Sequence, residues 1–310
     1  MQRVFPWWLR AFLIAGAIEA IAIGASSWLA PQGSLSRRLL PVSGGTLNYS
    51  SATYSGFDPA NPASSAPNPS AFALARLQPL NARVIGALYL AGAVGLIASY
   101  LARQALDARI FIFGFGFIAS SLLLITLAYW TDFTADHIPY GWLISYIVDP
   151  LVAAIAILAL GLMRPTLPGP HRLTPLLLFE GAVLGLCGLL LLLAPRTAAK
   201  LWPWTINDLL ARIYACFLLG FALGALLAAW EKRVLAIRPF AIASAAMPLF
   251  VIIASVRYLD LLRHGLREWT WFGTFSLLGL LFVAFLPSLF REEPRTFNAA
   301  KPTGSARATD

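Results

Sequence analysis

Apolar residues in this chain form continuous runs of about twenty residues and do not alternate with polar residues. Eight such runs occupy residues 10–30, 82–101, 109–130, 141–163, 174–194, 209–230, 238–258 and 269–290. A bilayer core of about 30 Å needs about 20 apolar residues per helix, and backbone in contact with lipid must satisfy its hydrogen bonds internally. The pattern therefore predicts an all-α integral membrane protein with about eight transmembrane helices.

The chain also contains an internal repeat. A Leu-Asn-Ala-Arg stretch at 80–83 returns as Leu-Leu-Ala-Arg at 209–212, and each stretch opens an apolar run. The same shift of 129 residues aligns residues of matching type: Gly95 with Gly224, Arg109 with Arg238, Phe111 with Phe240, Tyr129 with Tyr258, and Trp142 with Trp271. We expect two tandem four-helix repeats. Because each repeat has an even number of helices, the repeats should run parallel, with any ligand site between them.

The repeat also sets the expected domain boundaries. These are a first four-helix repeat over 1–165, a second over 170–292 and a disordered cytoplasmic tail over 293–310. Ala-Pro pairs at 30–31 and 194–195 end equivalent helices but lie 164 residues apart, so the first repeat carries 35 extra residues. This insert, at about 36–75, is rich in Ser, Pro, Gly and Asn and is predicted to be disordered and extracytoplasmic. The first helix is expected to be retained and not cleaved as a signal peptide.

Composition and charge agree with this class. Hydrophobic residues make up 59% of the chain and charged residues 12%, which is too little polar surface for a protein dissolved in water. Of the 23 Lys and Arg residues, 13 fall on the side of the termini and 10 on the other, which predicts that both termini are cytoplasmic. The net charge of +9 is spread over loops and indicates topology and contact with membrane lipids, not nucleic-acid binding.

Aromatic residues recur near the predicted outward ends of the helices. They include Trp130, Trp202, Trp204 and Trp271. Tryptophan and tyrosine are enriched where a membrane meets water, so most of these residues are expected to form an interfacial belt. The alternative is an aromatic cage for a lipid or an organic cation.

Two carboxylates inside the predicted helices are the sharpest candidates for function. An ionised side chain at a helix centre costs about 2.5–3.5 kcal/mol on insertion scales, so Glu19 and Glu180 require an explanation. One interpretation is a site that binds a proton or a cation. The alternative is a neutral glutamic acid that joins two helices by hydrogen bonds.

Arginines at the outward ends of the helices form a second set of candidates. Arg83 and Arg212 open the second helix of each repeat, and Arg257 lies near the outer end of the seventh helix. Bidentate bonds from such groups suit an anionic headgroup or carboxylate, whereas snorkelling to the interface is the structural alternative. Asp149 lies at a comparable depth in the fourth helix, so a pair with Arg83 is feasible if the two helices touch.

No residue cluster in the sequence specifies a reaction. All histidines fall in loops and both cysteines are isolated in apolar helices: His137, His171, His264, Cys187 and Cys216. Haem ligation within the helices, a disulfide framework and a metal cluster are therefore not indicated, and we expect no cofactor, no metal and no catalytic residue. The acid-base group left open is Asp132, Asp136 and His137, which share one outward loop.

The Trp-Pro-Trp turn at 202–204 and the Leu-x-Ala-Arg helix start at 209–212 carry a resemblance to known proteins. This layout resembles that of uncharacterised bacterial multi-pass membrane proteins over about 174–260. The first copy departs from it, because Gln-Pro-Leu stands at 78–80 in place of the tryptophans. The resemblance implies a bacterial cytoplasmic (inner) membrane and brings no activity and no catalytic residues with it.

Three functional hypotheses follow. In the first, the protein is transporter-like and binds or moves an amphiphilic or anionic small molecule or lipid; Arg83 and Arg212 meet the ligand, and Glu19 and Glu180 couple protons. In the second, the protein is a structural or accessory subunit that docks with a membrane-protein partner. In the third, it is a membrane enzyme that acts on lipid-linked substrates near Asp132. A polar cavity that reaches Glu19 would favour the first.

Overall fold

The computed structural model describes the chain in five stretches, 5–29, 79–131, 140–159, 171–231 and 233–291, and every regular element within them is a helix. Seven helices are long and apolar enough to cross a bilayer: α1 (Trp7–Leu29), α3 (Pro79–Tyr100), α4 (Arg109–Ala128), α7 (Thr174–Leu193), α9 (Asp208–Ala229), α10 (Val234–Val256) and α11 (Leu266–Arg291). A further helix, α6 (Tyr140–Ala159), contributes a shorter apolar segment. The prediction of an all-α, multi-pass membrane protein is confirmed, with seven candidate spans against the eight runs in the sequence.

Large apolar side chains are exposed on the outer surface of the long helices, including positions near the middle of α1 and α7. Ile18 is 63% exposed, Leu124 66%, Leu186 71% and Leu280 70%. In water such a surface would favour aggregation, whereas in a bilayer it meets lipid chains of similar polarity. These side chains are therefore placed to contact lipid.

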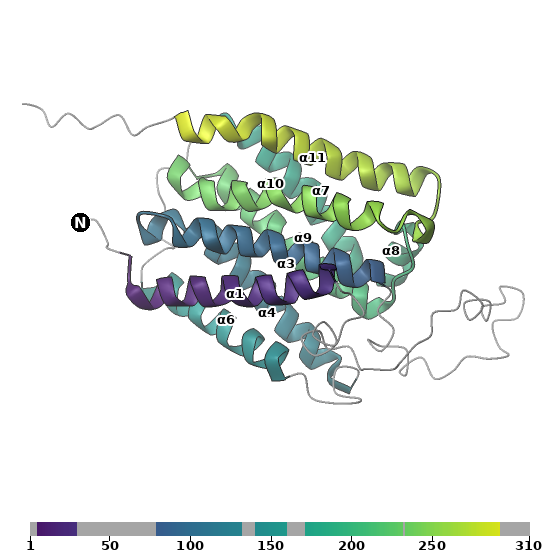
Figure 1. Cartoon of the computed structure of the whole chain (residues 1–310), viewed down its shortest axis with the longest axis horizontal. Helices are drawn as coiled ribbons and strands as arrows, with labels where there is room; N and C mark the ends of the chain where they lie inside the picture. The colour runs from purple at the N-terminus through teal and green to yellow at the C-terminus, as the bar shows by residue number, and fades with distance from the viewer. Residues whose placement is uncertain (1–4, 30–78, 132–139, 160–170, 232, 292–310) are drawn as a thin grey trace, which may run out of the picture.

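The long helices form two layers (Figure 1). Neighbouring helices pack extensively in the order α11, α10, α3, α1 in one layer and α7, α9, α4, α6 in the other. Fewer contacts join the layers, and most of those involve α4 or α10. Each layer combines two helices that precede residue 160 with two that follow it.

The two ends of the bundle differ in their short elements. The beginning of α1 and the end of α11 lie at one end, which we call the terminal end (Figure 1). There, the short helix η4 (Ala105–Asp107) joins α3 to α4. At the opposite end, called the α8 end, α8 (Pro195–Leu201) follows α7, and η5 (Leu259–Leu261) connects α10 to α11.

Glycines permit the closest helix pairs, α1 with α3 and α7 with α9. A Cβ atom at Gly24 would lie 2.9 Å from Cγ of Leu90, and one at Gly188 would lie 2.8 Å from Cγ of Leu219. Because neither glycine carries a side chain, the leucine of the neighbouring helix packs directly on its backbone.

Two further glycines each lie under a phenylalanine ring. A Cβ atom at Gly95 would come within 2.7 Å of Cδ2 of Phe111, and one at Gly224 within 2.7 Å of Cδ2 of Phe240. Each ring belongs to the helix that follows its glycine, so the contact draws α3 towards α4 and α9 towards α10.

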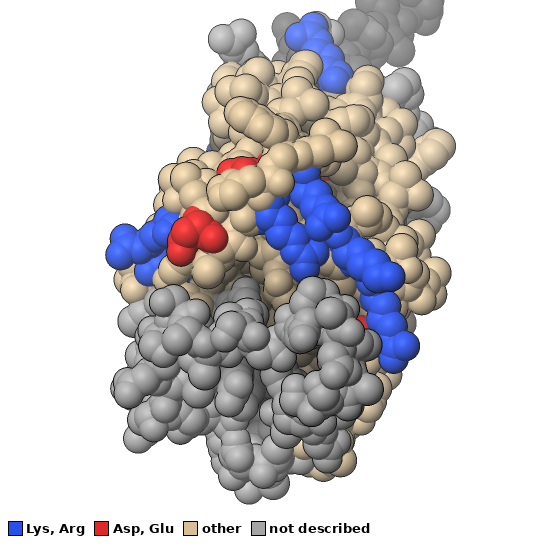
Figure 2. Space-filling view, turned by 90° about the vertical axis from the view of Figure 1, so that its right-hand side faces the viewer, with Lys and Arg blue, Asp and Glu red and all other residues tan. Residues whose placement is uncertain are grey.

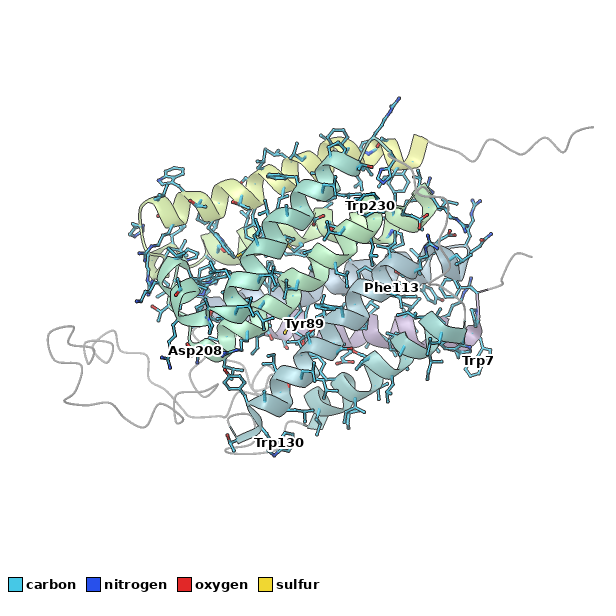
Figure 3. All side chains as sticks on the ribbon, turned by 180° about the vertical axis from the view of Figure 1, so that it is seen from behind. Trp7, Tyr89, Phe113, Trp130, Asp208 and Trp230 are labelled. Atoms are coloured by element: carbon cyan, nitrogen blue, oxygen red, sulfur yellow. The ribbon has the colours of Figure 1, made fainter. Side chains whose placement is uncertain are left out.

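Some of the predicted interfacial aromatic residues are in the protein core. Trp130 is exposed at the α8 end, and Trp7 and Trp230 are exposed at the terminal end, as a belt requires (Figure 3). By contrast, Trp202 and Trp204 are buried, and the edge of Trp202 packs against Trp204 with ring centroids 5.4 Å apart. Placing these two in the belt was wrong, because the turn that carries them folds inward.

Candidate functional site

A cavity lies between the layers and is lined by residues of six helices, α1, α3, α4, α6, α9 and α10. The space open to the centres of water-sized molecules is about 50 Å³. By this measure one water needs about 10–15 Å³, so the cavity holds a few waters or the head group of a larger molecule. Glu19 lines the cavity and is only half-buried, so the cavity reaches the outer surface of the bundle beside α1.

Two carboxylates line this cavity, Glu19 of α1 and Asp149 of α6, and they are close enough for their charges to interact. Ser145 donates a hydrogen bond to Glu19. Asp149 is 8% exposed and makes no hydrogen bond or salt bridge to any residue that the structure describes. None of the described lining residues is a lysine or arginine. The cavity therefore carries acidic groups without a basic partner on its wall.

A pair of tyrosines also lines the cavity. The hydroxyl groups of Tyr89 in α3 and Tyr146 in α6 hydrogen bond to each other. Tyr146 lies three residues before Asp149, so both project from the same face of α6. Reasoning from the sequence missed these tyrosines, although their hydroxyls stand midway along apolar helices and not at the membrane surface, where tyrosine is expected.

The rest of the cavity wall is largely aromatic. Five phenylalanines contribute to it: Phe111, Phe115, Phe217, Phe221 and Phe240. The ring of Tyr89 meets Phe217 edge-on at a centroid distance of 5.5 Å. Gly92 faces open space, because a Cβ atom built there has no neighbour within 4 Å. The faces of such rings carry partial negative charge, which adds to the acidic character of the site.

The polar groups of the cavity lie near the middle of their helices. Glu19 is the thirteenth of 23 residues in α1, Tyr89 the eleventh of 22 in α3, and Asp149 the tenth of 20 in α6. Figure 3 shows Tyr89 between the two ends of the bundle. At a rise of about 1.5 Å per residue, Glu19 is roughly 18 Å from the start of its helix. It lies deeper in the helix than the predicted run at 10–30 implies, because α1 begins at Trp7.

Glu180 does not join this group. It is fully buried in α7 next to Ser244 of α10, and both of its carboxylate oxygens lack a hydrogen-bond partner among the described residues. The structure therefore brings Glu19 together with Asp149, a residue for which the sequence suggested a different partner, and leaves Glu180 in a separate closed position.

The two repeated arginines each contact a tyrosine at the α8 end. The guanidinium carbon of Arg83 lies 5.3 Å from the ring centroid of Tyr258, and that of Arg212 lies 5.5 Å from the ring centroid of Tyr129. Arg212 also donates a hydrogen bond to the Tyr129 hydroxyl, and Arg83 donates one to the Leu29 carbonyl at 3.4 Å. Arg83 near the start of α3 thus contacts the chain just after α10, and Arg212 near the start of α9 contacts the chain just after α4.

The structure does not bring Asp149 and Arg83 together as a pair. Asp149 lines the cavity at mid-helix, whereas Arg83 is engaged at the helix end by Tyr258, and α3 and α6 are not neighbours in either layer. Arg257 is exposed at the end of α10. The α8 end carries Lys and Arg side chains in a band across its surface, seen end-on in Figure 2.

Ion pairs hold the terminal end together. Arg109 pairs with the buried Glu231, and Nη2 of Arg233 lies 2.8 Å from Oδ1 of Asp107. Arg233 also donates a hydrogen bond to the Gln104 side chain at 2.8 Å. Burial raises the pKa of the Asp107 carboxyl above its ordinary value, and the attraction of the Arg233 guanidinium offsets only part of this rise.

A buried hydrogen-bond network connects the start of α3 to the Trp-Pro-Trp turn. The side-chain oxygen of Asn81 accepts a bond from the Trp204 indole at 2.7 Å and a second from the Tyr214 hydroxyl at 2.8 Å. All three side chains are at most 1% exposed. Asn81 therefore has a structural role that its place in the repeated motif did not reveal.

The remaining candidates and the insert lie outside the described residues. These are Asp132, Asp136 and His137, together with the segment at 36–75. Within the described stretches, no group of three or more His, Cys, Asp or Glu residues is arranged to hold a metal. Comparison with protein families, curated proteins and solved structures finds no match for this chain. The site must therefore be interpreted from its own geometry.

Proposed function

We propose that the chain consists of two tandem four-helix repeats, with α6 as the fourth helix of the first. The helix boundaries support this, because α3 and α9 each have 22 residues and their starts and ends are both 129 residues apart. The ends of α1 and α7 are 164 residues apart, the shift of the two Ala-Pro pairs. On this proposal the first helix pairs with the second, and the third with the fourth, in both repeats.

Contacts between side chains support the same correspondence. Gly95 under Phe111 matches Gly224 under Phe240, and Gly24 against Leu90 matches Gly188 against Leu219. The contact of Arg83 with Tyr258 likewise matches that of Arg212 with Tyr129. On this arrangement the second helix of each repeat packs against the third helix of the other.

The proposed topology places both termini in the cytoplasm and the α8 end outside a bacterial inner membrane. Support comes from the charge bias of the loops and from the shared end at which α1 begins and α11 ends. Reporter fusions at the two termini provide the test. Reporters on opposite faces of the membrane would exclude the even number of crossings on which the repeats depend.

For the activity, we propose that the cavity binds, and the protein moves, a small amphiphilic molecule. One observation carries this proposal: a cavity at mid-helix depth is lined by both layers and holds two carboxylates, one of them buried without a polar partner among the residues that the structure describes. A helix bundle that served only to support a partner would gain stability by filling such a space with apolar side chains. The opening beside Glu19 is a route for an amphiphile to reach the site from the bilayer.

The test uses a variant that fills the cavity. Gly92→Leu places a side chain where a Cβ atom has no neighbour within 4 Å, and Gly273→Leu does the same away from the cavity. We expect mass spectrometry of the purified proteins to find a bound small molecule with the wild type and the Gly273→Leu variant, and to find less of it with Gly92→Leu. Equal amounts in all three would contradict the proposal. A membrane protein that co-purifies while these amounts stay equal would favour the accessory-subunit alternative.

Proton coupling is the second part of the proposed activity. Glu19 lines the cavity, and Glu180 is a buried carboxyl without a hydrogen-bond partner in the described part of the chain. Proton flux driven by the bound molecule should be measured in liposomes with Glu19→Gln and Glu180→Gln proteins. Unchanged coupling in both variants would remove these residues from the mechanism.

A further inference from the structure

The charge of the ligand follows from the groups that line the cavity. Of the described lining residues, Glu19 and Asp149 are the ionisable acids, and none carries a positive charge. A ligand with a negative charge would place like charges together in a region of low dielectric, where such repulsion is strong. Arg83 and Arg212, the arginines expected to meet an anionic ligand, instead contact tyrosines at the α8 end.

The neutral part of the wall suits the same kind of ligand. Five phenylalanines surround the space, and the linked hydroxyls of Tyr89 and Tyr146 offer oxygen atoms next to Asp149. An ammonium group with several alkyl substituents is attracted by the faces of aromatic rings, and such rings commonly bind quaternary ammonium ligands. Asp149 is the decisive group, because it is more than nine-tenths buried, lines the cavity and has no polar partner in the described structure.

The size and position of the cavity define the rest of the molecule. A space of about 50 Å³ for water centres accommodates a compact head group and not a large ring system. The cavity opens beside Glu19, which is half-buried and lies midway along α1. At this depth the outer surface of the bundle faces the hydrocarbon core. An apolar tail can therefore leave the cavity beside α1 and stay in the lipid.

We infer that the cavity binds an amphiphilic organic cation, with its alkylated ammonium head between Glu19, Asp149 and the aromatic rings and its apolar tail directed to the bilayer. This inference rests on the proposed function and adds the charge of the ligand to it. It replaces the anionic molecule suggested by the arginines with a molecule of opposite charge.

Three soluble probes of similar size separate the effects of charge and shape. Benzyltrimethylammonium is a cation, N,N-dimethylbenzamide is neutral and 3-phenylpropionate is an anion. Radiolabelled benzyltrimethylammonium is dialysed against the wild-type protein in lipid nanodiscs, with empty nanodiscs as the blank and the other two probes as competitors. We expect the cation to bind at least about tenfold more tightly than either competitor, a ratio that corresponds to about 1.4 kcal/mol.

Variants connect this preference to the cavity. Glu19→Gln and Asp149→Asn keep the shape of each side chain and remove its charge, so each should reduce the preference for the cation by about tenfold or more. Asp260→Asn removes an exposed acid after α10 and should leave the preference unchanged. Gly92→Leu should abolish binding of all three probes, while Gly273→Leu should not.

The outcomes distinguish the inference from the function on which it rests. If the three probes bind equally and Gly92→Leu blocks them all, the cavity is a binding site but its selectivity for cations is refuted. Tighter binding of the anion would refute it in the same way. If Gly92→Leu leaves the binding of every probe intact, the cavity is not the site, and both proposals fall.

Discussion

Replacing Asn81 by leucine should destabilise the protein because it removes the acceptor shared by two buried donors. Leucine is the residue at the aligned position 210, so the change preserves an apolar side chain of similar size. The Trp204 indole would lose its partner, and the Tyr214 hydroxyl would keep only the Asn81 backbone carbonyl at 3.4 Å. An orphaned buried donor costs about 1–3 kcal/mol, so the free energy of unfolding should fall by about 2–4 kcal/mol.

A double-mutant cycle with Tyr214→Phe isolates one of the two bonds. This change removes only the hydroxyl that donates to Asn81 at 2.8 Å. Because interhelical hydrogen bonds in membrane proteins average about 0.6 kcal/mol in such cycles, the coupling energy should be about 0.6–1.5 kcal/mol. The assay is reversible unfolding of the purified protein in mixed micelles titrated with a denaturing detergent. A loss below about 1 kcal/mol for Asn81→Leu, or strictly additive single variants, would refute the reasoning.

Three further predictions concern packing, a buried acid and pH. Gly95→Ala should lower the free energy of unfolding by about 1–3 kcal/mol, because the added Cβ atom overlaps the Phe111 ring. The control variant Gly273→Ala should be neutral or stabilising, because nothing lies within 4 Å of its added Cβ atom. Equal effects of the two variants in the same denaturing-detergent titration would contradict the close contact. Glu180→Met should raise the free energy of unfolding by about 1 kcal/mol, because it removes two buried oxygens that lack hydrogen-bond partners in the described structure. A decrease in the same titration would mean that the Glu180 carboxyl group makes a stabilising hydrogen bond. The raised pKa of Asp107 means that the folded state holds its proton more tightly than the unfolded state, so wild-type stability should fall relative to Asp107→Asn as the pH rises from the ordinary aspartate pKa through the raised value. Stability curves of the two proteins that stay parallel across this range would exclude this contribution of Asp107.

The class of the protein was readable from the sequence because it depends on local properties. Run length and hydropathy decide whether a helix can cross a membrane, and both are present in the residues themselves. The helix starts at Pro79 and Asp208 differ from the predicted runs by three residues or fewer. The counts differ at one helix, because α6 contributes a shorter apolar segment, Leu143–Ala159, among the described residues.

The candidate site was only partly predictable because it depends on which helices become neighbours. Glu19 was identified from its cost in the membrane, whereas Asp149, which lines the same cavity, was considered only as a possible partner of Arg83. A comparison of depths could not show that α3 and α6 lie in different layers and meet at Tyr89 and Tyr146, not at Arg83. Tyr89 and Tyr146, separated by 57 residues, meet only through the same packing. Fully buried tryptophans were likewise mistaken for interfacial ones, because hydropathy alone does not show the direction in which a turn folds.

The combination of two early and two late helices in each layer has a consequence for biosynthesis. When α3 and α4 have emerged from the ribosome, their later neighbours in the layers, α10 and α9, have not yet been made. The first half of the nascent chain must therefore wait in the membrane with its packing surfaces and its acidic residues exposed to lipid or to the insertion machinery. Final assembly of this protein is a late event, which begins only after most of the chain has been translated.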